Sequence, residues 1–118
     1  MPELILSRRA ALDIAVIEDD SIRRWGQAVA NSYLDSIDNA LQLVSDNPGL
    51  LRKFANSEQL LFYPVRKHSL FCTLYNDVIY VLTVRYGGMD LERLIHELEP
   101  FLLEEVEIMH RKLGREAP

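Results

Sequence analysis

The sequence predicts an α+β fold, in which an N-terminal helical hairpin packs on a small twisted antiparallel sheet and a C-terminal helical extension follows. Three observations predict this class. Residues 21–46 carry apolar side chains at helical spacing, and residues 59–86 are rich in β-branched and aromatic side chains. Residues 99–113 then return to helical spacing. The 118 residues suit one compact unit, which we divide into a core domain at 1–98 and an extension at 99–118.

The first elements are a short strand and a helix. Residues 3–6 form an apolar run that predicts an edge strand, and the Ser7 hydroxyl can cap the helix that follows. Apolar side chains at helical spacing continue this helix through residues 11–16. The acidic residues 18–20 would lie at the negative end of the helix dipole. We therefore expect a break near Asp20–Ser21.

A longer helix is expected from about residues 21–25 to the stop at Asn47-Pro48-Gly49. Its apolar side chains recur every four residues or nearly so, at Trp25, Val29, Tyr33, Ile37, Leu41 and Val44. Such a broad stripe is typical of a helix that packs on a sheet. The stripe predicts that the Trp25 ring is buried.

Three antiparallel strands are expected next, over residues 59–63, 65–75 and 78–86. The last is apolar almost throughout, which predicts a strand covered on both faces. Asn76-Asp77 suits a two-residue hairpin loop. That loop pairs Tyr75 with Val78, and counting outward places Arg85 opposite His68.

The C-terminal part predicts two helices. Asp90 can cap a short helix over residues 91–98, and Pro100 suits the first turn of the next. In the second helix, coiled-coil spacing relates four apolar residues, Leu102, Val106, Met109 and Leu113. This seam can close the core of its own chain, or it can bind a partner, for example in a homodimer. Both readings stay open.

Composition limits the classes of function. The net charge of −5 argues against direct nucleic-acid binding, because such binding requires surplus Lys and Arg. The sequence has a single cysteine and no run of the roughly 18 apolar residues needed to span a membrane, and we expect no signal peptide in its first residues. We therefore expect a cytoplasmic protein that does not bind membranes.

The sequence gives little support for a metal site or a catalytic nucleophile. His68 and Cys72 lie four residues apart on a predicted strand, about 13 Å, which is too far for two ligands of one ion. Cys72 lies within an apolar strand, where a free cysteine usually behaves as a small hydrophobic side chain. The sequence shows no phosphate-binding loop. We predict no metal and no cofactor.

One cluster could bind a target. Arg66, Lys67 and His68 are consecutive at a strand start, where Arg66 and His68 would share a face. Arg85 and Tyr86 lie near the end of the partner strand. Together they predict a small cationic surface at one end of the sheet. The alternative is an ordinary solvated strand end.

Three stretches resemble the ParE branch of the RelE/ParE superfamily, the toxins of type II toxin–antitoxin (plasmid stabilisation) modules. They are LSRRAALDIAVIEDD, RRWGQAVANSYLDSIDNALQLVSDNPGL and FYPVRKHSLFCTLYNDVIYVLTVRYGGMDLERLI. The resemblance covers about residues 4–95. The resemblance implies the same fold and a cognate antitoxin, whose extended tail folds as it wraps the toxin. Many ParE-like proteins have an aromatic-Arg pair at Cys72-Thr73, His at Tyr86 and Arg at Gly88, so this chain departs from the pattern there.

The resemblance implies one of three functions. ParE-like members poison DNA gyrase through protein contact, which requires no catalytic residue. RelE-like members are endoribonucleases that cut messenger RNA on the ribosome, and here that role would use His68, Arg85 and Tyr86. A third hypothesis is an interaction module that has the toxin fold without toxicity. The acidic composition favours the gyrase hypothesis, with Arg66, Lys67, His68, Arg85 and Tyr86 as the target-binding residues.

Overall fold

The computed structural model describes residues 3–54, 57, 59–87, 91–98 and 102–112. Its elements follow in the order β1 (Glu3–Leu6), α1 (Arg8–Trp25), α2 (Gln27–Asp46), a 3-10 turn (Pro48–Leu50), β2 (Arg52–Lys53), β3 (Leu61–Val65), β4 (His68–Tyr75), β5 (Val78–Tyr86), α3 (Leu91–Leu98) and α4 (Leu102–Lys112).

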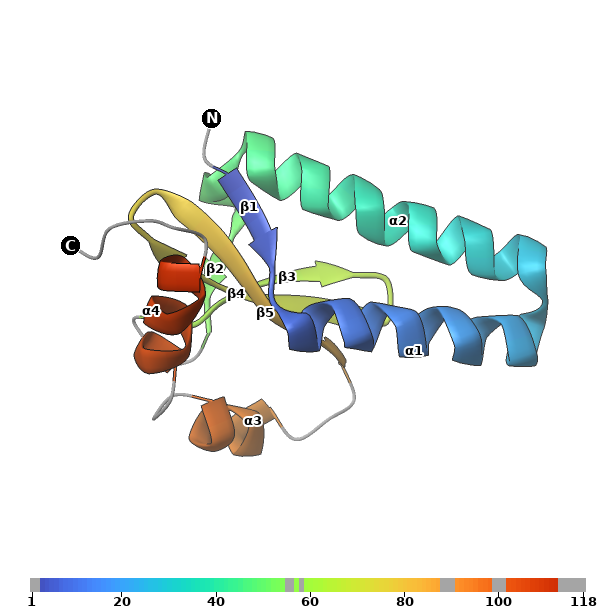
Figure 1. Cartoon of the computed structure of the whole chain (residues 1–118). Helices are drawn as coiled ribbons and strands as arrows, with labels where there is room; N and C mark the ends of the chain where they lie inside the picture. The colour runs from blue at the N-terminus through green and yellow to red at the C-terminus, as the bar shows by residue number, and fades with distance from the viewer. Residues whose placement is uncertain (1–2, 55–56, 58, 88–90, 99–101, 113–118) are drawn as a thin grey trace.

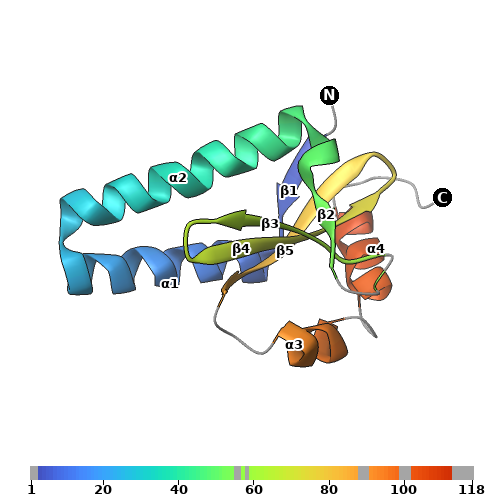
Figure 2. The same ribbon diagram turned by 180° about the vertical axis from the view of Figure 1, so that it is seen from behind.

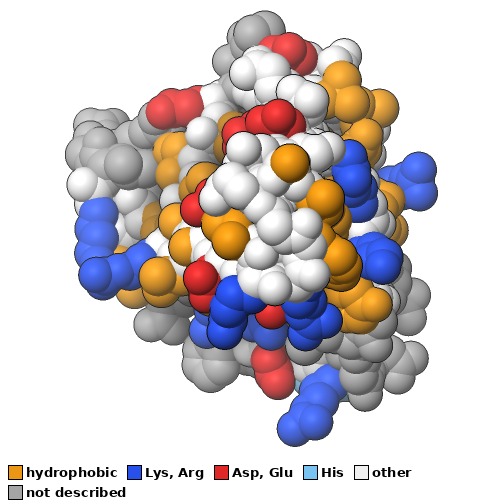
Figure 3. Space-filling view, turned by 90° about the vertical axis from the view of Figure 1, so that its right-hand side faces the viewer, with side chains coloured by type: hydrophobic (Ala, Val, Ile, Leu, Met, Phe, Trp, Pro, Cys, Tyr) orange, Lys and Arg blue, Asp and Glu red, His pale blue; other side chains and the backbone are white. Residues whose placement is uncertain are grey.

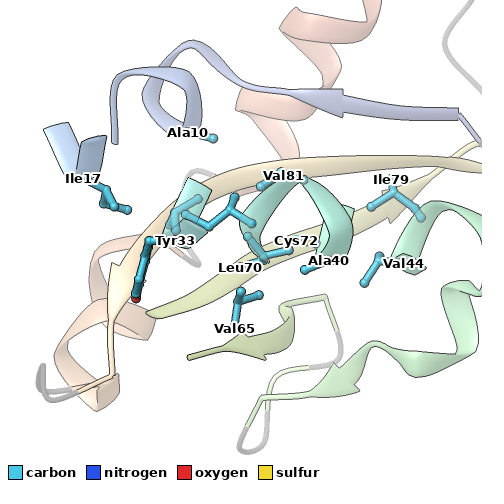
Figure 4. Packing of buried hydrophobic residues seen from close by; sticks show 12 residues of the cluster. Ala10, Ile17, Tyr33, Ala40, Val44, Val65, Leu70, Cys72, Ile79 and Val81 are labelled. Carbon is cyan, nitrogen blue, oxygen red and sulfur yellow. The ribbon is translucent and has the colours of Figure 1, made fainter. Parts of the chain in front are cut away.

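The elements form three layers (Figures 1 and 2). The α1–α2 hairpin covers one face of the sheet, and the C-terminal helices α3 and α4 lie on the other side. Each face has its own apolar cluster. Figure 4 shows the helical-hairpin side, where Tyr33, Ala40 and Val44 of α2 lie over Leu70 and Val81 of the sheet. The α+β class and the predicted helical hairpin are confirmed.

The sheet has five strands in the order β1-β5-β4-β3-β2. Strands β2 to β5 are antiparallel, but β1 pairs with β5 in parallel, so the sheet is mixed. The three predicted antiparallel strands are confirmed as β3 to β5, and the parallel pairing of β1 is an addition that the sequence does not predict. The chain leaves β1 through the whole helical hairpin and returns by way of β2 to β4, so no tight turn dictates how β1 aligns with β5. The two-residue strand β2 lies outside the strands that the sequence predicts.

Strand β5 is covered on both faces, as its apolar sequence predicts. Ile79 and Val81 belong to the cluster under the helical hairpin, and Val78 and Tyr80 belong to the cluster under α3 and α4. The predicted hairpin loop is confirmed: Asn76 and Asp77 have φ angles of 50° and 62°, as a type I′ turn requires. Tyr75 pairs with Val78, also as predicted.

The register farther along β4 and β5 differs from the prediction. His68 pairs with Tyr86, and Arg85 pairs with Ser69. The reason is a bulge: Phe71 pairs with Thr83 but Cys72 pairs with Val81, which leaves Leu82 as an extra residue on β5. Every pair beyond the bulge is displaced by one residue.

Helix α1 supplies partners for this bulge. The Ser7 hydroxyl donates to the Leu82 carbonyl (2.8 Å) and accepts from the Ala10 amide (3.0 Å) as the N-cap of α1. One Asp13 carboxylate oxygen accepts from the Thr83 hydroxyl (2.5 Å) and the Val84 amide (3.0 Å). The first two turns of α1 are thereby fastened to the irregular part of β5.

The break between the two long helices lies at Gly26, beyond the expected position at Asp20–Ser21. Gly26 has a φ of 87°, which costs glycine little. Ion pairs one helical turn apart support the continuous helix, from Arg23 to Asp19 (3.1 Å) and from Arg24 to Asp20 (3.2 Å). The earlier break is expected because acidic residues are unfavourable near the C-terminal end of a helix. Here the two arginines offset that effect for Asp19 and Asp20.

Trp25 is consequently the last residue of α1, and its side chain is 54% exposed. The prediction that this ring is buried is wrong. The prediction of a buried stripe is correct farther along the helix, since Tyr33, Ile37 and Val44 are buried. Trp25 and Val29 are exposed because they lie at the tip of the hairpin, beyond the end of the sheet.

At the C-terminal end, the structure confirms the two predicted helices, α3 and α4. The proposed cap Asp90 and the first-turn residue Pro100 lie outside the described residues. Among the helices that the structure describes, none is long and apolar enough to cross a membrane.

Candidate functional site

A groove of about 460 Å³ opens between α1, Tyr33 of α2, and the end of the sheet where the β3–β4 turn meets the last residue of β5. We call it the hairpin groove. Its lining residues are Val16, Ile17, Asp20, Ser21, Arg24, Trp25, Tyr33, Lys67, His68 and Tyr86. Figure 3 looks onto the right-hand side of Figure 1, towards the tip of the helical hairpin, where hydrophobic, basic and acidic side chains intermingle.

The structure brings three of the five predicted target-binding residues together. Lys67, His68 and Tyr86 line the hairpin groove, and the rings of His68 and Tyr86 meet edge to face at 5.7 Å. Tyr86 is 52% exposed, so its ring is accessible to a partner. The pairing of His68 with Tyr86 across β4 and β5 follows from the bulge.

Arg66 and Arg85 are not among the groove-lining residues. The Arg66 Nε donates to Ser36 Oγ (2.8 Å), and its guanidinium lies 5.5 Å from the centre of the Tyr33 ring. The Arg85 Nε donates to Thr83 Oγ1 (2.8 Å). The expected single cationic surface is therefore divided, with each guanidinium held by its own neighbours.

The turn between β3 and β4 explains part of this difference. Val65 pairs with His68, so Arg66 and Lys67 form a two-residue loop and not the start of a strand. The expectation that Arg66 and His68 share a strand face is wrong for this reason. Arg66 has a φ of 55°, which is uncommon for a residue other than glycine. Contacts with α2, and a hydrogen bond from the Gly87 amide to the Lys67 carbonyl (2.8 Å), hold the loop in place.

Tyr33 and His68 line the groove and contact each other. The Tyr33 hydroxyl lies 2.5 Å from His68 Nδ1, and the same oxygen accepts from the Lys67 amide (3.3 Å). Burial raises the pKa of Tyr33, although the Lys67 amide and the Arg66 charge oppose the shift. Burial lowers the pKa of His68, partly offset by the Asp20 carboxylate. Both side chains are therefore mainly in their neutral forms at pH 7.

Charges in the groove are mixed. Arg24 is paired with Asp20, whereas in the part of the chain that the structure describes no ion pair engages the Lys67 ammonium. Lys67 is therefore the groove's available positive charge. An apolar wall of Val16, Ile17 and Trp25 lies beside these polar groups.

The structure gives no support for a cysteine nucleophile or for a metal site among the described residues. Cys72 is fully buried, and burial raises the pKa of its thiol to about 12, so it is no nucleophile at neutral pH. Within the described ranges, no group of three His, Cys, Asp or Glu side chains could hold a metal ion.

Sequence reasoning missed Tyr33, Trp25 and the acidic turn of α1 as site residues. Tyr33 belongs to the helical stripe and reads as core, which it also is, since it is 9% exposed. It also lines the groove, where its hydroxyl meets His68. No spacing in the sequence links it to His68, which lies 35 residues away.

The predicted partner-binding seam of α4 faces inward where it is described. Val106 is 1% exposed within the cluster that includes Tyr80 and Phe71, and Met109 packs against that cluster. This placement matches the reading in which the helix closes its own core. The Leu102 side chain and Leu113 lie outside the described residues, and a homodimer through this helix stays a prediction.

Comparison with known proteins gives two findings. Residues 4–91 match the family described as the ParE toxin of the type II toxin–antitoxin system, parDE. A solved structure of the chromosomal ParDE toxin–antitoxin system from P. aeruginosa contains a similar chain, with a TM-score of 0.66 and 16% identity. The similarity covers 73% of this chain and 96% of that one, and it shows a shared fold. No curated protein matches the sequence.

Proposed function

This chain belongs to the ParE toxin family of type II toxin–antitoxin systems, and we propose that it is a toxin, neutralised by a cognate antitoxin and acting on DNA gyrase. The family match over residues 4–91 is the observation that carries this proposal. Action on gyrase implies a cytoplasmic site of action.

The arrangement of the basic residues supports gyrase over RNA as the target. An endoribonuclease has to hold a phosphate and move protons during attack by the 2′-hydroxyl. Arg66 and Arg85 have side-chain hydrogen bonds elsewhere, and Lys67 shares the groove with the Asp20 carboxylate. A polyanion gains little from such a surface, whereas a protein target can use its apolar and polar parts together.

Endoribonuclease activity is the second candidate, because His68 and Tyr86 lie side by side in an open groove. In that case these two residues would be the proton-transfer groups. Arg85 would need to leave Thr83 to reach the RNA.

Controlled expression in a bacterial host tests the proposal. We expect growth arrest, relief of the arrest by the antitoxin gene from the neighbouring reading frame, and DNA breaks that disappear in a strain with resistant gyrase. Purified protein should inhibit DNA supercoiling by gyrase and leave messenger RNA intact on ribosomes. Ribosome-dependent cleavage that is lost in His68→Ala would select the ribonuclease instead, and normal growth would indicate a non-toxic module.

A matched pair of variants tests the place of the site. Lys67→Glu reverses the available charge of the hairpin groove, and Lys53→Glu makes the same change on exposed β2. We expect Lys67→Glu to weaken gyrase inhibition at least about fivefold and Lys53→Glu to leave it unchanged. Equal effects of the two variants would place target binding elsewhere.

A further inference from the structure

The hydrogen bonds around Tyr33 determine which nitrogen of His68 carries its proton. The Tyr33 oxygen accepts from the Lys67 amide, and in the described part of the chain the only acceptor near its hydroxyl proton is His68 Nδ1. Because a buried hydroxyl is costly to leave unpaired, the proton lies between Tyr33 and Nδ1, with Tyr33 as donor. Nδ1 is then the acceptor, and neutral His68 carries its hydrogen on Nε2.

The second nitrogen has a different environment. Among the described residues, no hydrogen-bond partner engages His68 Nε2, and the imidazole lines the hairpin groove. Neutral His68 therefore offers the groove an N–H donor and no basic nitrogen. The adjacent Lys67 contributes an ammonium, which is also only a donor. The polar end of the groove therefore offers hydrogen-bond donors and suits a ligand that carries a hydrogen-bond acceptor.

We propose that the hairpin groove binds an Asp or Glu side chain of a partner polypeptide, through His68 Nε2–H and the Lys67 ammonium. The apolar residues beside that carboxylate in the partner pack on Val16, Trp25 and the exposed ring of Tyr86. Tyr33 acts as a positioning residue, because it holds His68 in the donor tautomer. This inference rests on the proposed function, in which the chain acts by binding proteins.

A carboxylate on a polypeptide fits better than a phosphate on a nucleic acid. A nucleic acid brings a run of neighbouring phosphates, and their additional negative charges would be repelled by the Asp20 carboxylate in the same groove and by the net charge of −5. A single carboxylate needs only the donors that are present. The apolar wall also suits side chains of a polypeptide, which bring apolar surface next to the acid.

Three small probes test the ligand chemistry on the intact chain: 3-phenylpropanoate, its neutral analogue 3-phenylpropanamide, and phenyl phosphate. Titration is followed by NMR through the His68 imidazole nitrogens and the single Trp indole. We expect the carboxylate to bind about fivefold more tightly than the amide and the phosphate, with shifts at His68 Nε2 and Trp25. Equal binding of the amide, tighter binding of the phosphate, or no shift at these groups would overturn the inference.

Two pairs of variants test the roles of the residues. Lys67→Gln should abolish the preference for the carboxylate over the amide, and Lys53→Gln should retain it. Tyr33→Phe removes only the hydroxyl and should let the Nδ1–H tautomer of His68 appear in the ¹⁵N spectrum, with weaker carboxylate binding. Tyr63→Phe is the matched control, and it should change neither. An unchanged tautomer in Tyr33→Phe would remove Tyr33 from this role.

The outcomes separate this inference from the proposed function. Gyrase-dependent growth arrest by a protein that shows no carboxylate preference overturns the inference and leaves the toxin proposal standing. A clear carboxylate preference in a protein that never arrests growth supports the groove chemistry and overturns the toxin proposal.

Discussion

Trp25 lies at the tip of the helical hairpin, where no strand lies beneath it. Its position on the apolar stripe of the helix predicted over residues 21–46 predicts burial, and replacing a buried tryptophan by alanine would cost about 3–5 kcal/mol of stability. With 54% of the side chain exposed, we expect Trp25→Ala to cost only about 1 kcal/mol. Urea denaturation measures this difference.

The comparison variant is Ile37→Ala, which lies on the same stripe and is fully buried. It should lose about 2–5 kcal/mol, because it leaves a cavity between α2 and the sheet. A loss in Trp25→Ala as large as that in Ile37→Ala would show that the ring is packed.

The protonation of His68 is a second feature that a single residue controls. Burial lowers its pKa and the Asp20 carboxylate opposes the shift, so we expect an NMR titration below the ordinary value of 6.5. Asp20→Asn should lower the pKa further, because the imidazolium loses its nearby negative charge. Asp19→Asn removes a carboxylate that pairs with Arg23 and should change the pKa of His68 less.

The same shift has a consequence for stability. A histidine whose pKa is lower in the folded protein binds its proton more readily when unfolded. Its contribution to the free energy of unfolding is therefore complete above about pH 6.5 and is lost as the pH falls below that value. A His68 pKa at or above 6.5 in the folded protein would contradict the burial seen here.

At the scale of elements, strand β5 and its hairpin loop are the parts that the sequence predicts best. Both signals are local: a run of β-branched and aromatic side chains, and two residues that tolerate positive φ. The register beyond the bulge could not be predicted in this way. The Ser7 hydroxyl that meets the Leu82 carbonyl comes from 75 residues away, so no local pattern marks where the extra residue lies.

The β3–β4 turn limits the site prediction for a similar reason. Arg66 and Lys67 are not typical residues of a two-residue hairpin loop, and the positive φ of Arg66 is held by contacts with α2. The sequence therefore predicts that Lys67, His68 and Tyr86 lie at one end of the sheet. It does not predict that Arg66 and Arg85 stay outside the groove that these three residues line. That division depends on tertiary hydrogen bonds.

The link between α1 and the bulge gives a third prediction. In Asp13→Ala the Thr83 hydroxyl and the Val84 amide both lose their acceptor. Because Thr83 is fully buried, water cannot easily replace the carboxylate, and we expect a loss of about 1–3 kcal/mol in the free energy of unfolding. Thermal and urea denaturation both measure it.

Asp35→Ala provides the matched control on the exposed side of α2, and it should change stability by less than about 0.5 kcal/mol. If Asp13→Ala were equally mild, the carboxylate would not be fastening the helix to the strand in solution.

At the scale of the whole molecule, the chain combines a ParE-family domain with C-terminal helices that cover the second face of its sheet. The family match ends at residue 91, and α4 lies beyond it. Val106 of this helix nevertheless joins the same cluster as Tyr80 and Phe71, on the face opposite the helical hairpin. The apolar packing of the sheet therefore continues beyond the end of the family match and across the domain boundary predicted at residue 98.

The fourth prediction tests whether α4 is part of the folded unit. Val106→Ala removes two buried methyl groups under the sheet and should reduce the free energy of unfolding by about 2 kcal/mol. Ile108→Ala, two residues away and 44% exposed, should cost less than about 0.5 kcal/mol. Urea denaturation with Trp25 fluorescence reports on the helical hairpin, and far-ultraviolet circular dichroism reports on all helices. A single transition that shifts equally by both probes in Val106→Ala would show that α4 unfolds together with the toxin domain. A shift that is seen by circular dichroism but not by Trp25 fluorescence would show that the extension unfolds as an independent segment.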